Sequence, residues 1–303
     1  MESVLITGGT GLIGSHISKK LKEKGYNIAF LSRKRISCST IPVYTWDPDK
    51  NIIEPEAISG ADYIIHLAGA GIGDKRWTGK RRELIVDSRV KTGELIFNKV
   101  LESGKNLKAF ISASGIGYYG TITSEKIFNE ADPPSNDFLG EVCRKWEEMA
   151  DRFNGSGIRT VKLRTGVVLA DKGGALGRMT NTVKMGIGST LGSGKQYIPW
   201  IHIDDLCNLY LKAVEDPFMI GAWNAVAPEH TTNKEFMRIL AEVLEKPFFF
   251  PAVPSFVLKI LFGKMSDIIL TGSRISAGKI ISSGYKFEYP GLGDALKNLF
   301  RKR

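Results

Sequence analysis

The amino-acid sequence predicts an α/β protein, with a doubly wound parallel sheet and a smaller mixed C-terminal lobe. Residues 1–170 alternate short apolar runs with amphipathic stretches, the rhythm of strands joined by crossover helices. A glycine-rich turn follows the first apolar run and opens the first amphipathic stretch. After about residue 171 the alternation breaks, and loops rich in glycine separate the remaining helical stretches. The chain is therefore expected to divide into residues 1–170 and 171–303, two parts that share an interface and are free to exchange segments.

Within the first part, six apolar runs predict strands and three amphipathic stretches between them predict helices. The expected strands are 4–7, 27–31, 43–46, 63–67, 109–113 and 159–163. The expected helices are 12–24, 80–103 and 138–154. The spacing of the strands admits right-handed crossovers throughout, so a doubly wound sheet is the natural arrangement.

The second part begins with glycine clusters that predict loops at 171–174, 186–189 and 192–194. Helices are expected at 204–214, 232–244, 255–261 and 293–300. Thr232 and Glu235 have the spacing of a capping box at the start of the second of these helices. Asp204 is expected to be the N-cap of the first.

The composition excludes several classes of protein. Of the 303 residues, 42 are Lys or Arg and 32 are Asp or Glu, a formal net charge of +10, and 43% are hydrophobic. Disorder requires low hydrophobicity with high charge, so a folded core is expected. Three separated cysteines without a CxxC pair exclude a disulfide scaffold and a cysteine-rich zinc site, and they fit a reducing, cytoplasmic compartment. The four histidines lack the spacing of metal ligands, so no metal is expected.

Neither a signal peptide nor a membrane partner is predicted. The first residues lack a basic region ahead of an apolar stretch. The longest apolar candidate, 248–262, is interrupted by Pro251, Pro254 and Lys259 and is too short to cross a bilayer. The densest basic stretch, 74–82, occurs without a recognisable nucleic-acid-binding motif. The surplus positive charge is therefore attributed to solvated surface and an anionic small-molecule ligand, with no nucleic acid as partner. A homodimer is compatible with the sequence.

The strongest local motif is the turn at 7–14, Thr-Gly-Gly-Thr-Gly-Leu-Ile-Gly, between an expected strand and an expected helix. Gly8 permits a tight turn, Gly11 the close approach of backbone to a pyrophosphate, and Gly14 the packing of helix on strand. The free N–H groups at the start of the helix favour phosphate. We therefore predict a Rossmann dinucleotide-binding domain rather than a plain glycine-rich turn.

The end of the second expected strand indicates which dinucleotide is bound. An NAD-dependent protein places Asp or Glu there for the ribose hydroxyls. This chain has Leu-Ser-Arg-Lys-Arg at 31–35 and no acidic residue until Asp47. A guanidinium suits a 2′-phosphate, so Arg33 is predicted to select NADP(H), with Ser32 and Lys34 assisting. The alternative is that these are ordinary surface charges.

A further cofactor element is the apolar run at 62–70, which ends in the small residues Ala68, Gly69 and Ala70. Here the backbone is expected to lie flat against the adenosine side of the cofactor. His66 lies inside this run, and a core histidine satisfied by backbone is favoured over a catalytic one.

These motifs, TGGTGLIG at 7–14 and HLAG at 66–69, resemble those of the extended short-chain dehydrogenases/reductases. DKRW at 74–77, DSRV at 87–90 and GSGKQYIPWIHIDDL at 192–206 are similar to an atypical epimerase-like subfamily, often labelled nucleoside-diphosphate-sugar epimerase, whose members carry a C-terminal domain of unknown function. SASGIGYYG at 112–120 and GYKFEYP at 284–290 fit it too, so the resemblance runs essentially from end to end.

The resemblance implies that residues 1–170 bind NADP(H), with Arg89 among the contacts and Val168 beside the nicotinamide. The substrate would lie between the sheet and the C-terminal lobe, 171–303. An open α/β sheet also places its ligand there, beyond the carboxyl ends of the strands. The cofactor residues expected from the motifs and the resemblance together are Gly8, Thr10, Gly11, Leu12, Ile13, Ser32, Arg33, Lys34, Leu67, Ala68, Gly69, Arg89 and Val168.

The catalytic pattern of this superfamily is missing. Its enzymes use a Tyr as acid or base, and a Lys four residues later stabilises the phenolate. None of the nine tyrosines in this chain has Lys at that spacing. When the helix at 138–154 is aligned on Glu147, Leu139 occupies the place of the Tyr and Cys143 the place of the Lys. Leu139 cannot move a proton, and Cys143 cannot supply a permanent positive charge.

Other residues are candidates for the lost roles. Ser114 matches the family's hydroxyl that orients a substrate oxygen, and Tyr118 or Tyr119 is a replacement acid on the same loop. A buried loop hydroxyl and packed aromatics are the alternatives.

For the substrate, Lys195 and Arg76 are expected to bind an anionic group, and Trp77 and Trp200 to line the pocket. The sequence thus predicts an NADP(H)-binding, epimerase-like oxidoreductase acting on an unknown small molecule. A non-catalytic NADP(H)-dependent sensor or scaffold is the alternative, because the Tyr/Lys pair is absent.

Overall fold

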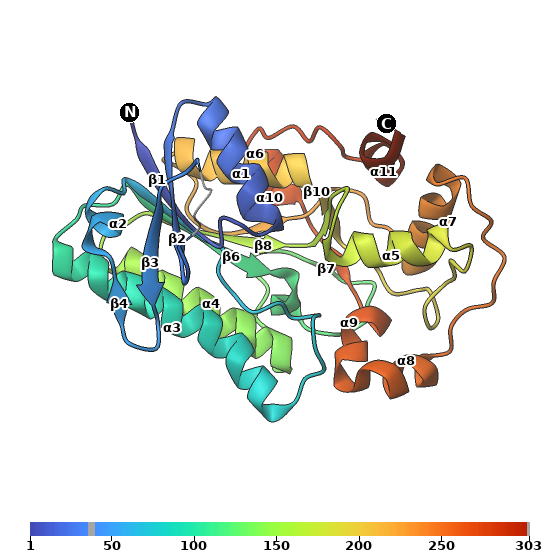
Figure 1. Ribbon diagram of the computed structural model, residues 1–303. Helices are drawn as coiled ribbons and strands as arrows, with labels where there is room; N and C mark the ends of the chain where they lie inside the picture. Colours follow the sequence, from blue (N-terminus) through green and yellow to red (C-terminus); the bar gives the residue numbers. More distant parts are fainter. Residues whose placement is uncertain (36–39, 302–303) are drawn as a thin grey trace.

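A computed structural model describes residues 1–35 and 40–301 of the chain, so Cys38 lies outside the described residues (Figure 1). Its centre is an eight-stranded sheet in the order β11-β8-β6-β5-β1-β2-β3-β4. Neighbouring strands are parallel except for β4, which pairs antiparallel with β3. The order runs outward from β1 in both directions, which confirms the predicted doubly wound arrangement.

The strands of this sheet are β1 (Ser3–Thr7), β2 (Asn27–Ser32), β3 (Val43–Asp47), β4 (Ile52–Ile53), β5 (Tyr63–His66), β6 (Ala109–Gly115), β8 (Thr160–Thr165) and β11 (Gly221–Ala225). Two small parallel pairs join β9 (Val167–Leu169) to β10 (Trp200–His202) and β7 (Ile127–Phe128) to β12 (Arg274–Ile275). The helices are α1 (Leu12–Glu23), α2 (Pro55–Ser59), α3 (Gly79–Ser103), α4 (Phe138–Gly155), α5 (Gly174–Lys184), α6 (Ile203–Glu215), α7 (Asn233–Val243), α8 (Ser255–Phe262), α9 (Asp267–Leu270), α10 (Gly278–Ser282) and α11 (Leu292–Arg301), with 3-10 turns η1 (Ile116–Tyr119) and η2 (Gly263–Ser266). All six expected strands and all seven expected helices are present.

Both faces of the large sheet are covered, because its strands are apolar on both sides. In β1, Val4 and Ile6 point into one core cluster while Leu5 points into another. The first cluster lies under α1 and α6, and the second lies under α2, α3 and α4. Figure 1 shows α1 and α6 on one side of the sheet and α3 and α4 side by side on the other.

The helix ends follow local sequence signals, with one correction. Thr232 and Glu235 form the predicted capping box of α7. Gly104 ends α3 in the left-handed region, φ 63°, which favours glycine. The N-cap of α6 is His202, whose ring nitrogen accepts a hydrogen bond from the N–H of Asp204, so the prediction of Asp204 as N-cap was wrong by two residues.

The C-terminal region does not begin cleanly at residue 170. Both α6 and β11 follow that residue, yet α6 packs against α1 and β11 pairs with β8 in the large sheet. Helices α5, α7 and α11 form a separate core with the β9–β10 pair. No helix in residues 1–35 and 40–301 combines the length and apolar character needed to span a bilayer.

Candidate active site

The glycine-rich turn between β1 and α1 has a backbone that only glycine accommodates at two positions. Gly8 has φ +69°, and a side chain there would meet the carbonyl carbon of Leu67 at 3.2 Å. A Cβ on Gly14 would lie 2.6 Å from Gly9 Cα. The N-cap residue Gly11 is exposed and places no side chain on the first N–H groups of α1. These open N–H groups at a helix start fit a pyrophosphate.

The end of β5 is held by a chain of hydroxyl and imidazole groups. Thr7 Oγ1 accepts hydrogen bonds from the N–H groups of Leu67 and Ala68, both at 3.0 Å. The Thr7 hydroxyl therefore donates its own proton in the hydrogen bond to His66 Nδ1, at 2.9 Å. His66 Nε2 then carries the ring proton and donates to Thr92 Oγ1 at 3.3 Å. Burial lowers the pKa of His66 to about 4. His66 is thus a neutral core histidine, with threonine hydroxyls as partners, and it fixes the backbone expected to lie against the cofactor.

Arg89 reaches the same edge from α3. It is 6% exposed, and its guanidinium donates to the carbonyls of Ala70 at 3.0 Å and Ile85 at 2.8 Å. A Cβ on Gly69 would lie 3.0 Å from Arg89 Cζ, so glycine allows the guanidinium to lie against the backbone. Arg89 Nε is buried with no hydrogen-bond partner among the described residues. Burial lowers the pKa of Arg89 to about 10, which leaves a cation at neutral pH beside the backbone that follows β5.

The carboxyl end of β2 lies beside the glycine turn, because Leu31 is paired with Thr7. Ser32 is partly buried, and Arg33 and Lys34 are exposed without an ion pair to any residue that the structure describes. Their neighbour Arg35 pairs with Glu54 instead. The strand end therefore presents two uncompensated cations.

Elements α5 and β9 lie beside the glycine turn as well. A Cβ added to Gly174, at the start of α5, would lie 3.4 Å from a Leu12 methyl carbon and 4.0 Å from the Val168 carbonyl oxygen. Leu12, Ile13, Leu67 and Val168 are all partly buried on the same core cluster. The structure thus brings the expected cofactor residues of β1, β5 and β9 to one edge of the sheet, and their contact with a cofactor stays a prediction.

The helix face on which the sequence resemblance implies a Tyr/Lys pair is covered here. Leu139 and Cys143 are buried beneath the loop after β6, where a Cβ on Gly117 would lie 3.2 Å from Leu139 Cβ and 3.7 Å from Cys143 Sγ. Burial raises the pKa of Cys143 to about 12, so this thiol is neither a nucleophile nor a base at neutral pH.

Below Ser114 lies a buried ion pair. Arg164 on β8 donates to both carboxylate oxygens of Glu147 on α4, at 2.8 and 2.9 Å. Ser114 Oγ donates to the same carboxylate at 2.8 Å. Although burial opposes its charge, the hydrogen bonds and charge of Glu147 raise the pKa of Arg164 above its ordinary value. Ser114 is therefore anchored toward the core, with its oxygen lone pairs left to accept a bond.

The two tyrosines of η1 differ in their surroundings. Tyr119 is buried, donates to Asn224 Oδ1 at 2.7 Å and accepts from Arg164 at 2.9 Å. Tyr118 is partly exposed, and the Arg164 guanidinium lies 3.4 Å from the centre of its ring. Burial raises the pKa of Tyr118, with Arg164 opposing the rise. Of the two alternatives for a replacement acid, Tyr118 is the one with an accessible side chain.

The four expected substrate residues are not gathered in one place. Trp77 is partly buried, with its ring edge-on to Phe138. Arg76 donates to the carbonyl of Leu261 at the end of α8, and Lys195 is exposed on the loop before β10. Trp200 is a correction: its indole is completely buried in the C-terminal core and has no surface to line a pocket.

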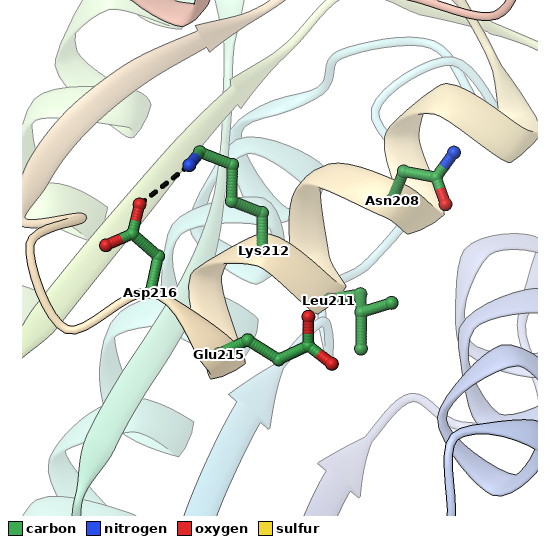
Figure 2. Close-up of a pocket in the computed structure, with 5 residues that line it drawn as sticks. All are labelled: Asn208, Leu211, Lys212, Glu215 and Asp216. Carbon is green, nitrogen blue, oxygen red and sulfur yellow. Dashed lines mark hydrogen bonds and ion pairs between the residues drawn. The ribbon is translucent and has the colours of Figure 1, made fainter. Parts of the chain in front are cut away.

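Two hollows lie elsewhere. One of about 310 Å³ follows the exposed side of α6, where Lys212 and Asp216 form an ion pair at 2.7 Å (Figure 2). A second, of about 150 Å³, is lined by Ser3 and Asn27 at the starts of β1 and β2. The C-terminal end of α6 leads to the start of β11, so both hollows lie at the amino edge of the sheet. Ligands of open α/β sheets bind at the opposite edge.

Sequence reasoning missed Glu147 and Arg164, although a signal was present. Lys162 and Arg164 alternate on an otherwise apolar strand, and Glu147 and Asp151 are one turn apart on α4. Residues two apart on a strand share one face of the sheet, and residues four apart on a helix share one face of the helix. The two basic residues of β8 therefore face the two acidic residues of α4, with which they form ion pairs.

Comparison with known proteins gives a consistent result over the whole chain. The model of the NAD dependent epimerase/dehydratase family matches residues 4–225, and that of a domain of unknown function, DUF1731, matches residues 253–299. The human epimerase family protein SDR39U1 is 33% identical over 98% of this chain and 99% of its own length. The Bacillus subtilis epimerase family protein YfhF is 34% identical over 99% of both chains.

Solved structures agree. A crystal structure of human epimerase family protein SDR39U1 (isoform 2) with NADPH has a TM-score of 0.89 and 32% identity, covering 99% of this chain and 100% of that one. A nucleoside-diphosphate sugar epimerase from Corynebacterium glutamicum has a TM-score of 0.80 and 29% identity over 99% of this chain and 58% of its own. MoeE5, in complex with UDP-glucose and NAD, shares the fold with a TM-score of 0.80 at 18% identity.

Proposed function

This chain belongs to the NAD dependent epimerase/dehydratase family, and we propose that it binds NADP(H) and acts as an epimerase-like oxidoreductase on an unidentified small molecule. The end of β2 carries the proposal. Arg33 and Lys34 are exposed there without ion pairs to described residues, and the strand end has no carboxylate to take ribose hydroxyls. A 2′-phosphate is the anion that completes this arrangement. The NADPH in the structure of the human relative supports the same choice.

On binding, the chain's own groups would act at separate points along the cofactor. The N–H groups at the start of α1 would hold the pyrophosphate, and Ser32 with Arg33 the 2′-phosphate. Arg89 Nε is buried without a hydrogen-bond partner among the described residues, and the Arg89 guanidinium would donate a hydrogen bond to the cofactor on the nicotinamide side. The nicotinamide ring supplies or accepts a hydride when bound.

The proton that accompanies the hydride is assigned to Tyr118 Oη. Because burial raises the pKa of Tyr118, its phenol is protonated at neutral pH and is able to donate to a substrate oxygen. The Arg164 guanidinium beneath its ring holds the ring in place. Ser114 Oγ donates a hydrogen bond to Glu147, so its oxygen would accept a hydrogen bond from a substrate hydroxyl.

A screen of carbonyl metabolites for NADPH consumption tests this assignment. With an active substrate, Tyr118→Phe is expected to lower kcat at least about 100-fold while the dissociation constant of NADPH stays the same. Tyr44→Phe is the matched control, because Tyr44 lies on β3 with no contact to η1. Full activity in Tyr118→Phe would remove Tyr118 from the mechanism.

A non-catalytic NADP(H)-dependent sensor or scaffold is the second candidate, favoured by the burial of Leu139 and Cys143 where the proton-transfer pair lies in related enzymes. It predicts tight NADPH binding without consumption by any carbonyl compound, together with protection of the C-terminal region from proteolysis when NADPH is bound. The cytoplasmic location and the homodimer stay predictions from the sequence.

A further inference from the structure

Residues 246–266, here called the docking segment, leave large apolar side chains uncovered. The segment contains α8 and the apolar run that the sequence singles out as too short to span a bilayer. Its exposed apolar side chains are Phe249 (74% exposed), Phe250, Phe256 (65%), Ile260 (69%) and Leu261. A helix this apolar is normally buried, and exposed apolar surface of this extent indicates an interaction site.

The shape of α8 restricts what covers it. Phe256 and Ile260 are one turn apart, and Lys259 and Leu261 are exposed on either side of them. At about 100° per residue these four positions cover an arc of about 200°. A helix held in a protein groove presents a stripe of about 100°. The exposed arc of α8 is therefore wider than the stripe that a protein groove covers, so its partner must contact the helix over most of its outer surface. Figure 1 shows α8 at the margin of the molecule.

The charge of the docking segment indicates an anionic partner. It contains Lys246, Lys259 and Lys264 and no acidic residue. All three lysines are exposed, and none forms an ion pair with a described residue. In a two-fold dimer through this surface, lysines would face lysines, because a two-fold interface pairs a patch with itself. Apolar side chains flanked by lysines are instead typical of segments that lie on anionic membranes.

We propose that the docking segment binds an anionic lipid surface, with Phe256 and Ile260 at the boundary of headgroups and acyl chains and the lysines at the headgroup phosphates. No membrane partner was predicted from the sequence, because the apolar run 248–262 is interrupted by proline and is too short to cross a bilayer. A helix that lies in the interface needs no spanning length.

The docking segment is joined to the candidate active site. Arg76, on the loop that follows β5, donates to the backbone carbonyls of Ile260 and Leu261. In Figure 1, β6 and β8 point toward the side of the molecule on which α8 lies. A lipid surface bound by α8 would therefore lie beside the carboxyl edge of the sheet.

Vesicle flotation of the full chain tests the proposal. The protein is expected to float with vesicles of phosphatidylcholine mixed with phosphatidylglycerol and much less with phosphatidylcholine alone. Phe256→Glu combined with Ile260→Glu should weaken binding at least about tenfold. Phe218→Glu is the matched control: Phe218 is 88% exposed on the loop before β11, at the opposite edge of the sheet, and its variant should bind as the parent does. Equal thermal unfolding of the variants shows that they are folded.

The charge contribution is tested separately. Replacing Lys246, Lys259 and Lys264 by Gln should weaken binding to the anionic vesicles about 100-fold, since each lysine contributes about fivefold. The proposal is overturned if the parent chain does not float with anionic vesicles, or if Phe256→Glu/Ile260→Glu floats equally well. A lipid-free dimer that this double variant dissociates, measured by light scattering, would also overturn it and assign the surface to a second copy.

Discussion

Two parts of the same sheet edge differ in construction: the part around β1, β2 and β5, proposed to bind the cofactor, and the part around β6, β8 and α4, proposed for proton transfer. Around β1, β2 and β5 this edge is built from glycines, the open N–H groups of α1 and a neutral histidine held between two threonine hydroxyls. Around β6, β8 and α4 the family's Tyr/Lys face is sealed beneath Gly115 and Gly117, and a buried ion pair, Arg164–Glu147, supports the loop instead. The part proposed to hold the cofactor is thus formed mainly by backbone, whereas the part proposed for proton transfer depends on side chains that differ from the pattern the resemblance implies.

The largest expected effect breaks the ion pair on the proton-transfer side. Glu147→Ala leaves the Arg164 guanidinium buried without an anion, so we expect the free energy of unfolding to fall by about 3–5 kcal/mol. Urea denaturation measures this. Glu148→Ala, one residue further on α4, removes an exposed pair with Arg144 and should change stability little. Equal losses in the two variants would contradict a structural role for Glu147.

The cofactor side should show its own pH dependence. Unfolded histidine binds a proton below about pH 6.5, whereas folded His66 does so only below a pKa of about 4. The unfolded state therefore binds more protons in this window, and stability falls as pH drops from 6.5 to 4, by about 3 kcal/mol in total. Denaturation at several pH values should show a smaller drop in His66→Gln than in His16→Gln. An unchanged pH profile in His66→Gln would exclude His66 as its source.

A smaller effect is expected from the glycine turn. The Cβ of Gly14→Ala would lie 2.6 Å from Gly9 Cα, so the turn must shift, at about 1–3 kcal/mol of stability. NADPH affinity should fall at least about tenfold, because the phosphate-binding N–H groups move with the turn. Gly79→Ala is the control, since nothing lies within 4 Å of a Cβ added at that helix start. Fluorescence titration with NADPH that shows equal affinity for both variants would contradict the role of the turn.

The two sides also differ in how well the sequence predicts them. The glycine turn is predictable because its requirements are local: a strand, four glycines and a helix follow one another within residues 3–23. The Arg164–Glu147 pair joins a strand to a helix and was missed, although alternating charges on an apolar strand were visible. Trp200 was expected to line the substrate pocket, whereas 200–202 form β10, paired with β9 inside the core. The division at residue 170 allowed segments to cross it, but the sequence did not identify β11 as one of them, because β11 pairs with β8 between residues 60 apart.

The central claim, that this edge of the sheet binds NADP(H), is tested most directly by the dissociation constants of NADPH and NADH for the parent chain and Arg33→Ala. We expect NADPH to bind more tightly than NADH, and Arg33→Ala to weaken NADPH at least about tenfold while NADH is unaffected. Arg35→Ala, which removes the partner of Glu54, should leave both constants unchanged. Tighter binding of NADH than of NADPH, or an Arg33→Ala variant that discriminates as the parent does, would contradict the account.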